Sequence, residues 1–140
     1  MQEEVSKRSL KVVIVESQPQ VREELNIILE LAGGLEEPPI AVVAEAGSGN
    51  EAMRVARSLQ PEVVIISIEA PLPDLVMEAG QIKQAFPEIR VIVLSIRSDP
   101  KACEQARLFG VDAIIQKGAP VEELISAIRS KPVSHPGRGV

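Results

Sequence analysis

The chain is poor in aromatic, cysteine and histidine residues. It contains no tryptophan, no tyrosine and only two phenylalanines, Phe86 and Phe109. The core must therefore be aliphatic, and the stacked aromatic platforms that bind single-stranded nucleic acid are not expected. A single cysteine, Cys103, excludes an intrachain disulfide. A single histidine, His135, argues against a zinc site and a serine hydrolase, and no Gly-x-Ser-x-Gly motif surrounds Ser67.

The chain also lacks long apolar runs and an excess of positive charge. No run is long enough to cross a bilayer and no signal peptide heads the sequence, so we expect a cytoplasmic protein with no membrane contact. The formal net charge of −5 argues against direct contact with nucleic acid. Apolar residues make up 45% of the 140 residues, which predicts one globular domain.

Strand-like segments alternate with amphipathic helical segments. Val/Ile-rich strands are expected at 11–15, 40–45, 62–67, 90–95 and 112–116. Helices are expected at 19–32, 49–59, 74–86, 100–110 and 120–130. This alternation predicts a doubly wound α/β sandwich with a parallel sheet. We expect residues 11–130 to form the domain, residues 1–10 to be a flexible lead, and residues 131–140 to be a linker or disordered tail.

The first expected helix has apolar residues on two sides. Its main stripe comprises Val21, Leu25, Ile28 and Ala32, which we expect to face the sheet. Ile27 and Leu31 lie off that stripe, and we expect them to be exposed and to form a small patch for a homodimer or a protein partner.

Polar residues follow the strands at their carboxyl ends, where ligands bind in open α/β sheets. Glu16 and Ser17 follow the first strand, Ser67 ends the third, Ser95 ends the fourth, and Lys117 follows the fifth. We expect these residues to gather at one edge of the sheet.

Several segments resemble the receiver domain of response regulators. The matching segments are 13–19 at the first strand, 46–52 at the turn into the second helix, 61–71 at the third strand and 110–118 at the last strand. The resemblance runs from about residue 11 to 129. It implies a CheY-like (βα)5 flavodoxin-like three-layer sandwich with strand order 2-1-3-4-5. It also implies cytoplasmic two-component signal transduction by phosphorelay, in which a histidine kinase passes a phosphoryl group to an aspartate.

Compared position by position with that family, the residues divide into retained and altered ones. Receivers hold Mg²⁺ with acids near the first strand, bind the phosphoryl oxygens with a hydroxyl and a lysine, and carry an aromatic switch residue on the last strand. The resemblance assigns Glu16 to one acid, Ser95 to the hydroxyl and Lys117 to the lysine. The altered positions are Ser67 for the phosphoacceptor aspartate, Ser17 for the second acid and Ile114 for the aromatic switch.

These changes predict that the chemistry is lost. A serine without an adjacent base is a poor nucleophile, and it would form a stable phosphate ester instead of a labile acyl phosphate. Mg²⁺ prefers octahedral oxygen ligands that include carboxylates, so we expect its binding to be lost or weak at Glu16. We expect Lys117 to pair with Glu16 and keep the pocket neutral. The sequence thus predicts a non-enzymatic pseudo-receiver, independent of phosphorylation and without a required cofactor, that acts through protein contacts.

Two other functions stay open. One is a conventional receiver that retains residual phosphate or Mg²⁺ binding. The other is a nucleotide-binding domain, because Gly47, Gly49 and Ala52 form G-x-G-x-x-A between a strand and a helix, with Glu69 about 20 residues on. The motif follows the second strand instead of the first, which weakens that hypothesis. In many receivers an output domain that binds DNA follows the last helix, and we expect such a domain either to be missing from this chain or to be unnecessary to it.

Overall fold

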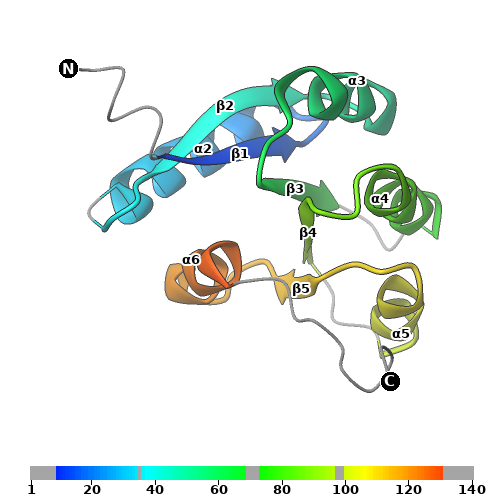
Figure 1. Ribbon diagram of the computed structural model, residues 1–140. Helices are drawn as coiled ribbons and strands as arrows, with labels where there is room; N and C mark the ends of the chain where they lie inside the picture. The colour runs from blue at the N-terminus through cyan, green and yellow to red at the C-terminus, as the bar shows by residue number, and fades with distance from the viewer. Residues whose placement is uncertain (1–8, 35, 69–72, 97–99, 131–140) are drawn as a thin grey trace, which may run out of the picture.

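The computed structural model describes residues 9–34, 36–68, 73–96 and 100–130, which contain a five-stranded sheet (Figure 1). The strands are β1 (Leu10–Val15), β2 (Ile40–Ala46), β3 (Val63–Ile68), β4 (Arg90–Ser95) and β5 (Ala113–Gln116). The helices are α2 (Pro19–Gly33), α3 (Gly49–Leu59), α4 (Pro73–Ala85), α5 (Pro100–Leu108) and α6 (Val121–Arg129). All neighbouring strands are parallel and their order is β2-β1-β3-β4-β5, which confirms the predicted fold. The expected tail and most of the expected lead lie outside the described residues.

The sheet separates two helical layers. Helices α2 and α6 cover one face, and α3, α4 and α5 cover the other (Figure 1). Side chains on successive strand residues point to opposite faces, so the valines and isoleucines of the central strands divide between two cores. Val13, Val64 and Val91 are neighbours in register and pack toward α3, α4 and α5. The residues that follow them, Ile14, Ile65 and Ile92, pack toward α2 and α6.

The start of α3 has Ser48 and, three residues later, Glu51, a spacing that favours a helix cap. Ser48 Oγ accepts a hydrogen bond from the amide of Glu51 at 3.2 Å, which caps the helix. The Glu51 carboxylate accepts a bond from the amide of Gly47 at 2.9 Å, one residue before the position that a capping box would use. These two bonds satisfy amide groups that have no partner within the helix.

The predicted buried stripe of α2 is wrong in one part. Ile28 is 42% exposed, whereas Leu29, which the prediction left out, is fully buried. The helix meets the sheet along the row that joins Leu25, Leu29 and Gly33, at spacings of four residues. At the end of this row the helix approaches the sheet so closely that a Cβ on Gly33 would lie 2.5 Å from Ile40 Cδ1. Helix α2 is therefore rotated slightly about its axis, relative to the prediction, so that Leu29 faces the sheet in place of Ile28.

The exposure predicted for the other two apolar residues of α2 is confirmed. Ile27 is 50% exposed and Leu31 is 71% exposed. None of the helices in the described ranges is long and apolar enough to span a membrane.

We predict that Leu29→Ala lowers the free energy of unfolding by about 2–5 kcal/mol, because it leaves a cavity beneath α2. Urea denaturation followed by circular dichroism measures the change, since the chain has no tryptophan. The matched variant Leu31→Ala should change the free energy by less than about 0.5 kcal/mol. Equal effects of the two substitutions would contradict the observed rotation of the helix.

Candidate functional site

The carboxyl ends of four strands meet at one edge of the sheet. In register, Val15 of β1 lies beside Ile66 of β3, so Glu16 and Ser67 follow at neighbouring positions. Ser95 lies beside Gln116, and the amide of Lys117 donates a hydrogen bond to the Ser95 carbonyl at 2.7 Å. The parallel arrangement thus places the predicted site residues Glu16, Ser67, Ser95 and Lys117 at this edge.

Glu16 is a carboxylate held almost entirely out of solvent. Its side chain has no exposed surface, and Oε2 accepts a hydrogen bond from the Gln18 amide at 3.0 Å. Oε1 lies 3.9 Å from Lys117 Nζ and has no hydrogen-bond partner among the described residues. The expected contact between Lys117 and Glu16 is present, at a length typical of a loose ion pair.

Ser67 is buried at the same edge, and only 7% of its surface is exposed. Its Oγ atom is inaccessible to solvent and has no hydrogen-bond partner in the part of the chain that the structure describes. A buried hydroxyl without a partner is costly, so an occupant of the adjoining space that could bond this atom would be stabilised.

The other predicted site residues have different surroundings. Ser17 is exposed, directly after the buried Glu16. Ser95 is half-buried at the end of β4. Ile114 is half-buried and packs against the core beneath α3, α4 and α5, so a residue at this position contacts the layer opposite α2 and α6.

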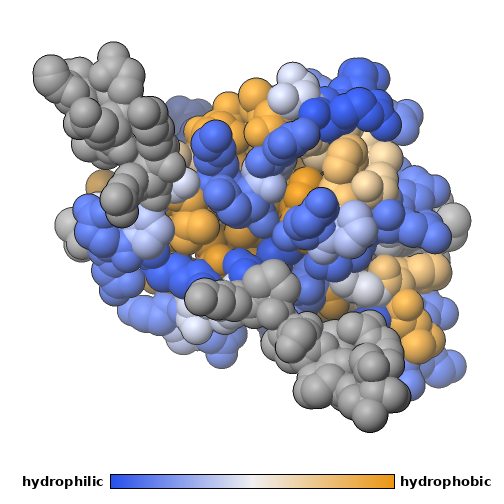
Figure 2. Space-filling view, viewed as in Figure 1, coloured by the Kyte–Doolittle hydropathy of each residue, from blue (hydrophilic) through white to orange (hydrophobic). Residues whose placement is uncertain are grey.

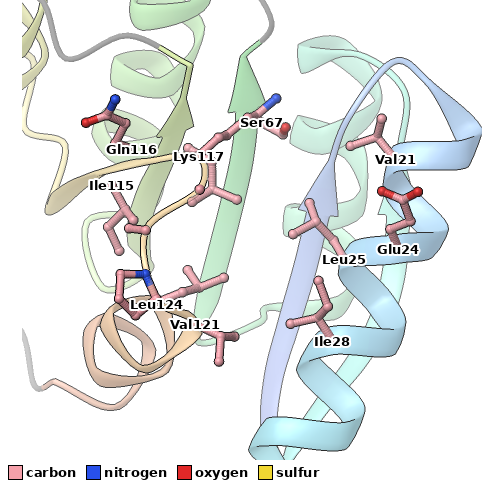
Figure 3. Close-up of a pocket in the computed structure, with 14 residues that line it drawn as sticks. Val21, Glu24, Leu25, Ile28, Ser67, Ile115, Gln116, Lys117, Val121 and Leu124 are labelled. Carbon is pink, nitrogen blue, oxygen red and sulfur yellow. The ribbon is translucent and has the colours of Figure 1, made fainter.

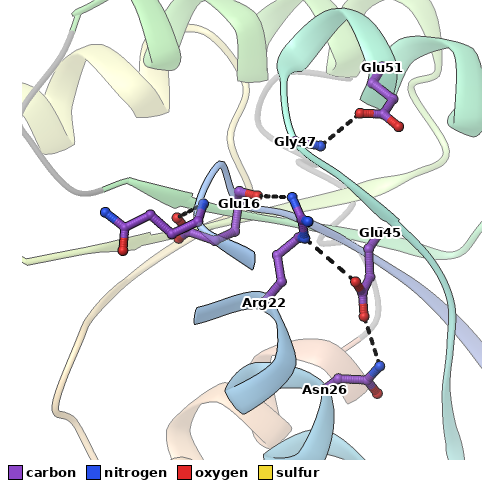
Figure 4. A network of polar contacts seen from close by, with 7 residues as sticks. Glu16, Arg22, Asn26, Glu45, Gly47 and Glu51 are labelled. Carbon is purple, nitrogen blue, oxygen red and sulfur yellow. Dashed lines mark hydrogen bonds and ion pairs between the residues drawn. The ribbon is translucent and has the colours of Figure 1, made fainter. Parts of the chain in front are cut away.

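Arg22 organises the loop after β1, a role that the sequence analysis missed. Its Nη1 donates to the Glu16 carbonyl at 2.8 Å, and its Nε lies 3.5 Å from a carboxylate oxygen of Glu45 on β2 (Figure 4). Asn26 donates to the other Glu45 oxygen at 2.9 Å. The sequence feature that could have indicated this role is an arginine in the first turn of a helix that follows an acidic loop. The network fixes the backbone that presents Glu16.

A groove between α2 and the segment after β5 was also missed. It has a volume of about 280 Å³ and lies between Leu25 and Ile28 on one side and Val121 and Leu124 on the other, with Ser67 at one end (Figure 3). Apolar surface is visible where α2 and α6 face each other (Figure 2). Ile28, which the sequence pattern predicted to be buried, is partly exposed because its side chain lines this groove.

The glycine motif before α3 is occupied by carboxylates. The Gly47 amide is bonded to the Glu51 carboxylate, and a Cβ on Gly49 would collide with the Glu78 carboxylate. Two acidic side chains at this helix start would repel a pyrophosphate. Glu69, the proposed ribose contact, lies outside the described residues. The surroundings of Gly47, Gly49 and Ala52 therefore do not favour the nucleotide-binding hypothesis.

Within the described ranges, no group of three or more His, Cys, Asp and Glu side chains is arranged to hold a metal ion.

Burial lowers the pKa of Arg90, and the attraction of Asp112 partly offsets this effect. Arg90 begins β4, so it lies at the end of the strands opposite the candidate site.

Comparison with known proteins identifies the family. Residues 12–129 match the response regulator receiver domain, and the chain belongs to that family. The match begins within β1 and reaches the end of α6. The domain is thus a module of two-component signal transduction.

Several named proteins are similar to this chain in sequence, and one is similar in structure. The transcriptional regulatory protein DegU of Brevibacillus brevis is 26% identical over 129 residues, which is 92% of this chain and 52% of DegU. The oxygen regulatory protein NreC of Staphylococcus carnosus is 29% identical over 86% of this chain and 54% of its own length. A DNA-binding response regulator of the LuxR family from Staphylococcus aureus has a crystal structure that superimposes with a TM-score of 0.71 at 27% identity, covering 85% of this chain and 95% of that one. The chain spans about half the length of the curated relatives it matches.

We predict that Lys117→Met lowers the free energy of unfolding by about 1–3 kcal/mol, because Glu16 keeps a buried charge without a facing cation. The double variant Glu16→Gln/Lys117→Met should recover part of this loss, since it removes both charges. Urea denaturation of the two single variants and the double variant measures the coupling. Strictly additive effects would show that the two groups do not interact.

Proposed function

We propose that this domain is a degenerate receiver that works without phosphorylation and signals through protein contacts. The observation that carries the proposal is the identity of the buried residue at the end of β3. Ser67 occupies the place that the resemblance assigns to the phosphoacceptor aspartate. A serine hydroxyl needs a neighbouring base to attack phosphorus, and its Oγ has no hydrogen-bond partner among the described residues.

The donor set at this edge fits Mg²⁺ poorly. Glu16 is a single carboxylate, one of whose oxygens is bonded to the Gln18 amide. Ser17, assigned to the second acid, carries no charge and is exposed. Mg²⁺ keeps near-ideal octahedral geometry and is usually held by carboxylates together with phosphate oxygens and waters. Phosphoryl transfer depends on charge neutralisation by such a metal, so the loss of ligands weakens the reaction further.

The pair of Glu16 and Lys117 supports a fixed conformation. In the receivers that this chain resembles, the lysine at the position of Lys117 binds a phosphoryl oxygen. Here the Lys117 ammonium group lies 3.9 Å from the fully buried Glu16 carboxylate. A ligand shifts a conformational equilibrium only through different affinities for the two states. With its charge already balanced, Lys117 has less to gain from an incoming phosphoryl group. The half-buried Ile114 lacks the aromatic ring that would report such a change.

The proposed output is contact with a protein partner or a second copy through α2. Ile27 and Leu31 lie one turn apart and are both exposed. The relatives include regulators of transcription, and the S. aureus structure is described as a DNA-binding response regulator. We propose that any DNA contact belongs to an output region other than this acidic domain, and that the domain works in the cytoplasm.

The test is an amide NMR spectrum recorded with and without Mg²⁺ and beryllofluoride, which mimics the phosphoryl group of receivers. We expect no shifts at Glu16, Ser67, Ser95 or Lys117. The positive control is the variant Ser17→Asp/Ser67→Asp, which restores both missing acids and should show saturable shifts at these positions. Saturable shifts in the unaltered protein would favour the alternative of a conventional receiver with residual phosphate and Mg²⁺ binding.

A second prediction concerns the α2 surface. If the domain self-associates through Ile27 and Leu31, the variant Ile27→Glu/Leu31→Glu should sediment as a monomer at concentrations where the unaltered protein dimerises. The matched control is Leu108→Glu, because Leu108 is 80% exposed on α5, in the opposite layer. Equal effects of the two substitutions on sedimentation would contradict a dimer through α2.

A further inference from the structure

The groove between α2 and α6 has the size of a site for a small molecule. Its volume of about 280 Å³ lies close to the lower end of the range for ligand pockets. It is separate from the exposed Ile27 and Leu31, neither of which lines it. The proposed protein contacts through α2 therefore leave this space unexplained.

The walls of the groove are aliphatic. Leu25 and Ile28 of α2 lie across from Val121 and Leu124 of α6 (Figure 3). Leu94 and Ile115, which belong to adjacent strands, line the same space. Such a surface favours an apolar occupant, because transfer of apolar area out of water is favourable.

One end of the groove is polar and carries a buried group without a partner. Ser67 lines this end and is 93% buried, and its Oγ has no hydrogen-bond partner in the described ranges. A hydroxyl can both donate and accept, so a ligand with one hydroxyl or carbonyl group could satisfy it. Because Oγ is closed to solvent in this structure, the ligand would bond it after a rotation about the Ser67 Cα–Cβ bond that turns the hydroxyl toward the groove. This buried polar atom is the observation that points to a ligand instead of a merely uneven surface.

The charges around the groove favour an uncharged ligand. Lys117 lines the polar end, but its ammonium group faces the buried Glu16 carboxylate at 3.9 Å. Glu24, which is exposed on α2, adds a negative charge at the rim. Because the Lys117 charge is offset by Glu16 behind it, an anionic ligand would gain little at the polar end and would be repelled by Glu24 at the rim.

We propose that the groove between α2 and α6 binds a small, uncharged, mainly aliphatic molecule whose hydroxyl or carbonyl group forms a hydrogen bond with Ser67 Oγ. Because the ligand contacts both α2 and α6, its binding would stabilise one relative position of these helices. A ligand of this class would supply an input to the domain that does not require phosphorylation.

The test uses 1-hexanol as the probe and methyl NMR of the Ile, Leu and Val side chains as the readout. We expect saturable shifts of the methyl groups of Leu25, Ile28, Val121 and Leu124. Hexanoate has the same chain length but carries a charge, and it should bind at least about fivefold more weakly. The proposal is overturned if 1-hexanol gives no saturable shifts, or if hexanoate binds as tightly.

Two variants locate the binding site, with a third as control. Ser67→Ala should weaken 1-hexanol binding by about fivefold to tenfold, the usual effect of one lost hydrogen bond. Val121→Trp should abolish binding because the indole fills the groove. Leu31→Ala, outside the groove, should leave binding unchanged. Unaltered affinity in Ser67→Ala, or retained binding in Val121→Trp with a native-like spectrum, would overturn the proposal.

A partner's side chain is the competing occupant. Methyl shifts in the groove that appear on concentrating the protein alone, and that 1-hexanol does not displace, would show that a second copy fills it and would overturn the proposal. The beryllofluoride experiment uses a different probe and reads backbone amides at the strand ends, whereas 1-hexanol is read on methyl groups of α2 and α6. Failure of one proposal would therefore not be mistaken for failure of the other.

Discussion

The buried carboxylate of Glu16 constrains the whole functional edge of the sheet. Its burial requires compensation, which comes from the Gln18 amide on one side and from Lys117 across the sheet on the other. Because α2 begins shortly after Glu16 and α6 shortly after Lys117, this contact joins the starts of the two helices that form one layer. The contact thus brings together the two walls of the groove, and Arg22 holds the loop between Glu16 and α2.

The fold was predictable because local signals and tertiary packing agree. The Val/Ile-rich strands are buried on both faces in the centre of the sheet, and the cap at Ser48 forms as the sequence indicates. The stripe on α2 was mispredicted because periodicity alone does not fix the rotation of a helix. The close approach of Gly33 to Ile40 decides that rotation. This contact joins the end of α2 to the start of β2, and the sequence pattern does not specify how the chain connects them.

The candidate site was predictable in its location and only partly in its contacts. Parallel strands bring Glu16, Ser67 and Lys117 to one edge whatever their chemistry. The Arg22 network and the groove depend on side-chain directions, which residue types do not reveal. The meaning of Ser17, Ser67 and Ile114 rests on the comparison with receivers, because a serine at the end of a strand is ordinary by itself. Because the chain belongs to the receiver family, these residues can be compared with the family's residues at the same positions, and the differences have chemical consequences.

The central claim is that Ser67 does not act as a phosphoacceptor. Its most direct test is intact mass spectrometry after incubation with Mg²⁺ and a small-molecule phosphodonor such as acetyl phosphate. The account predicts that the mass of the unaltered protein stays the same, while the Ser17→Asp/Ser67→Asp variant gains one phosphoryl group. A phosphoryl group gained by the unaltered protein and not by Ser67→Ala would contradict the account.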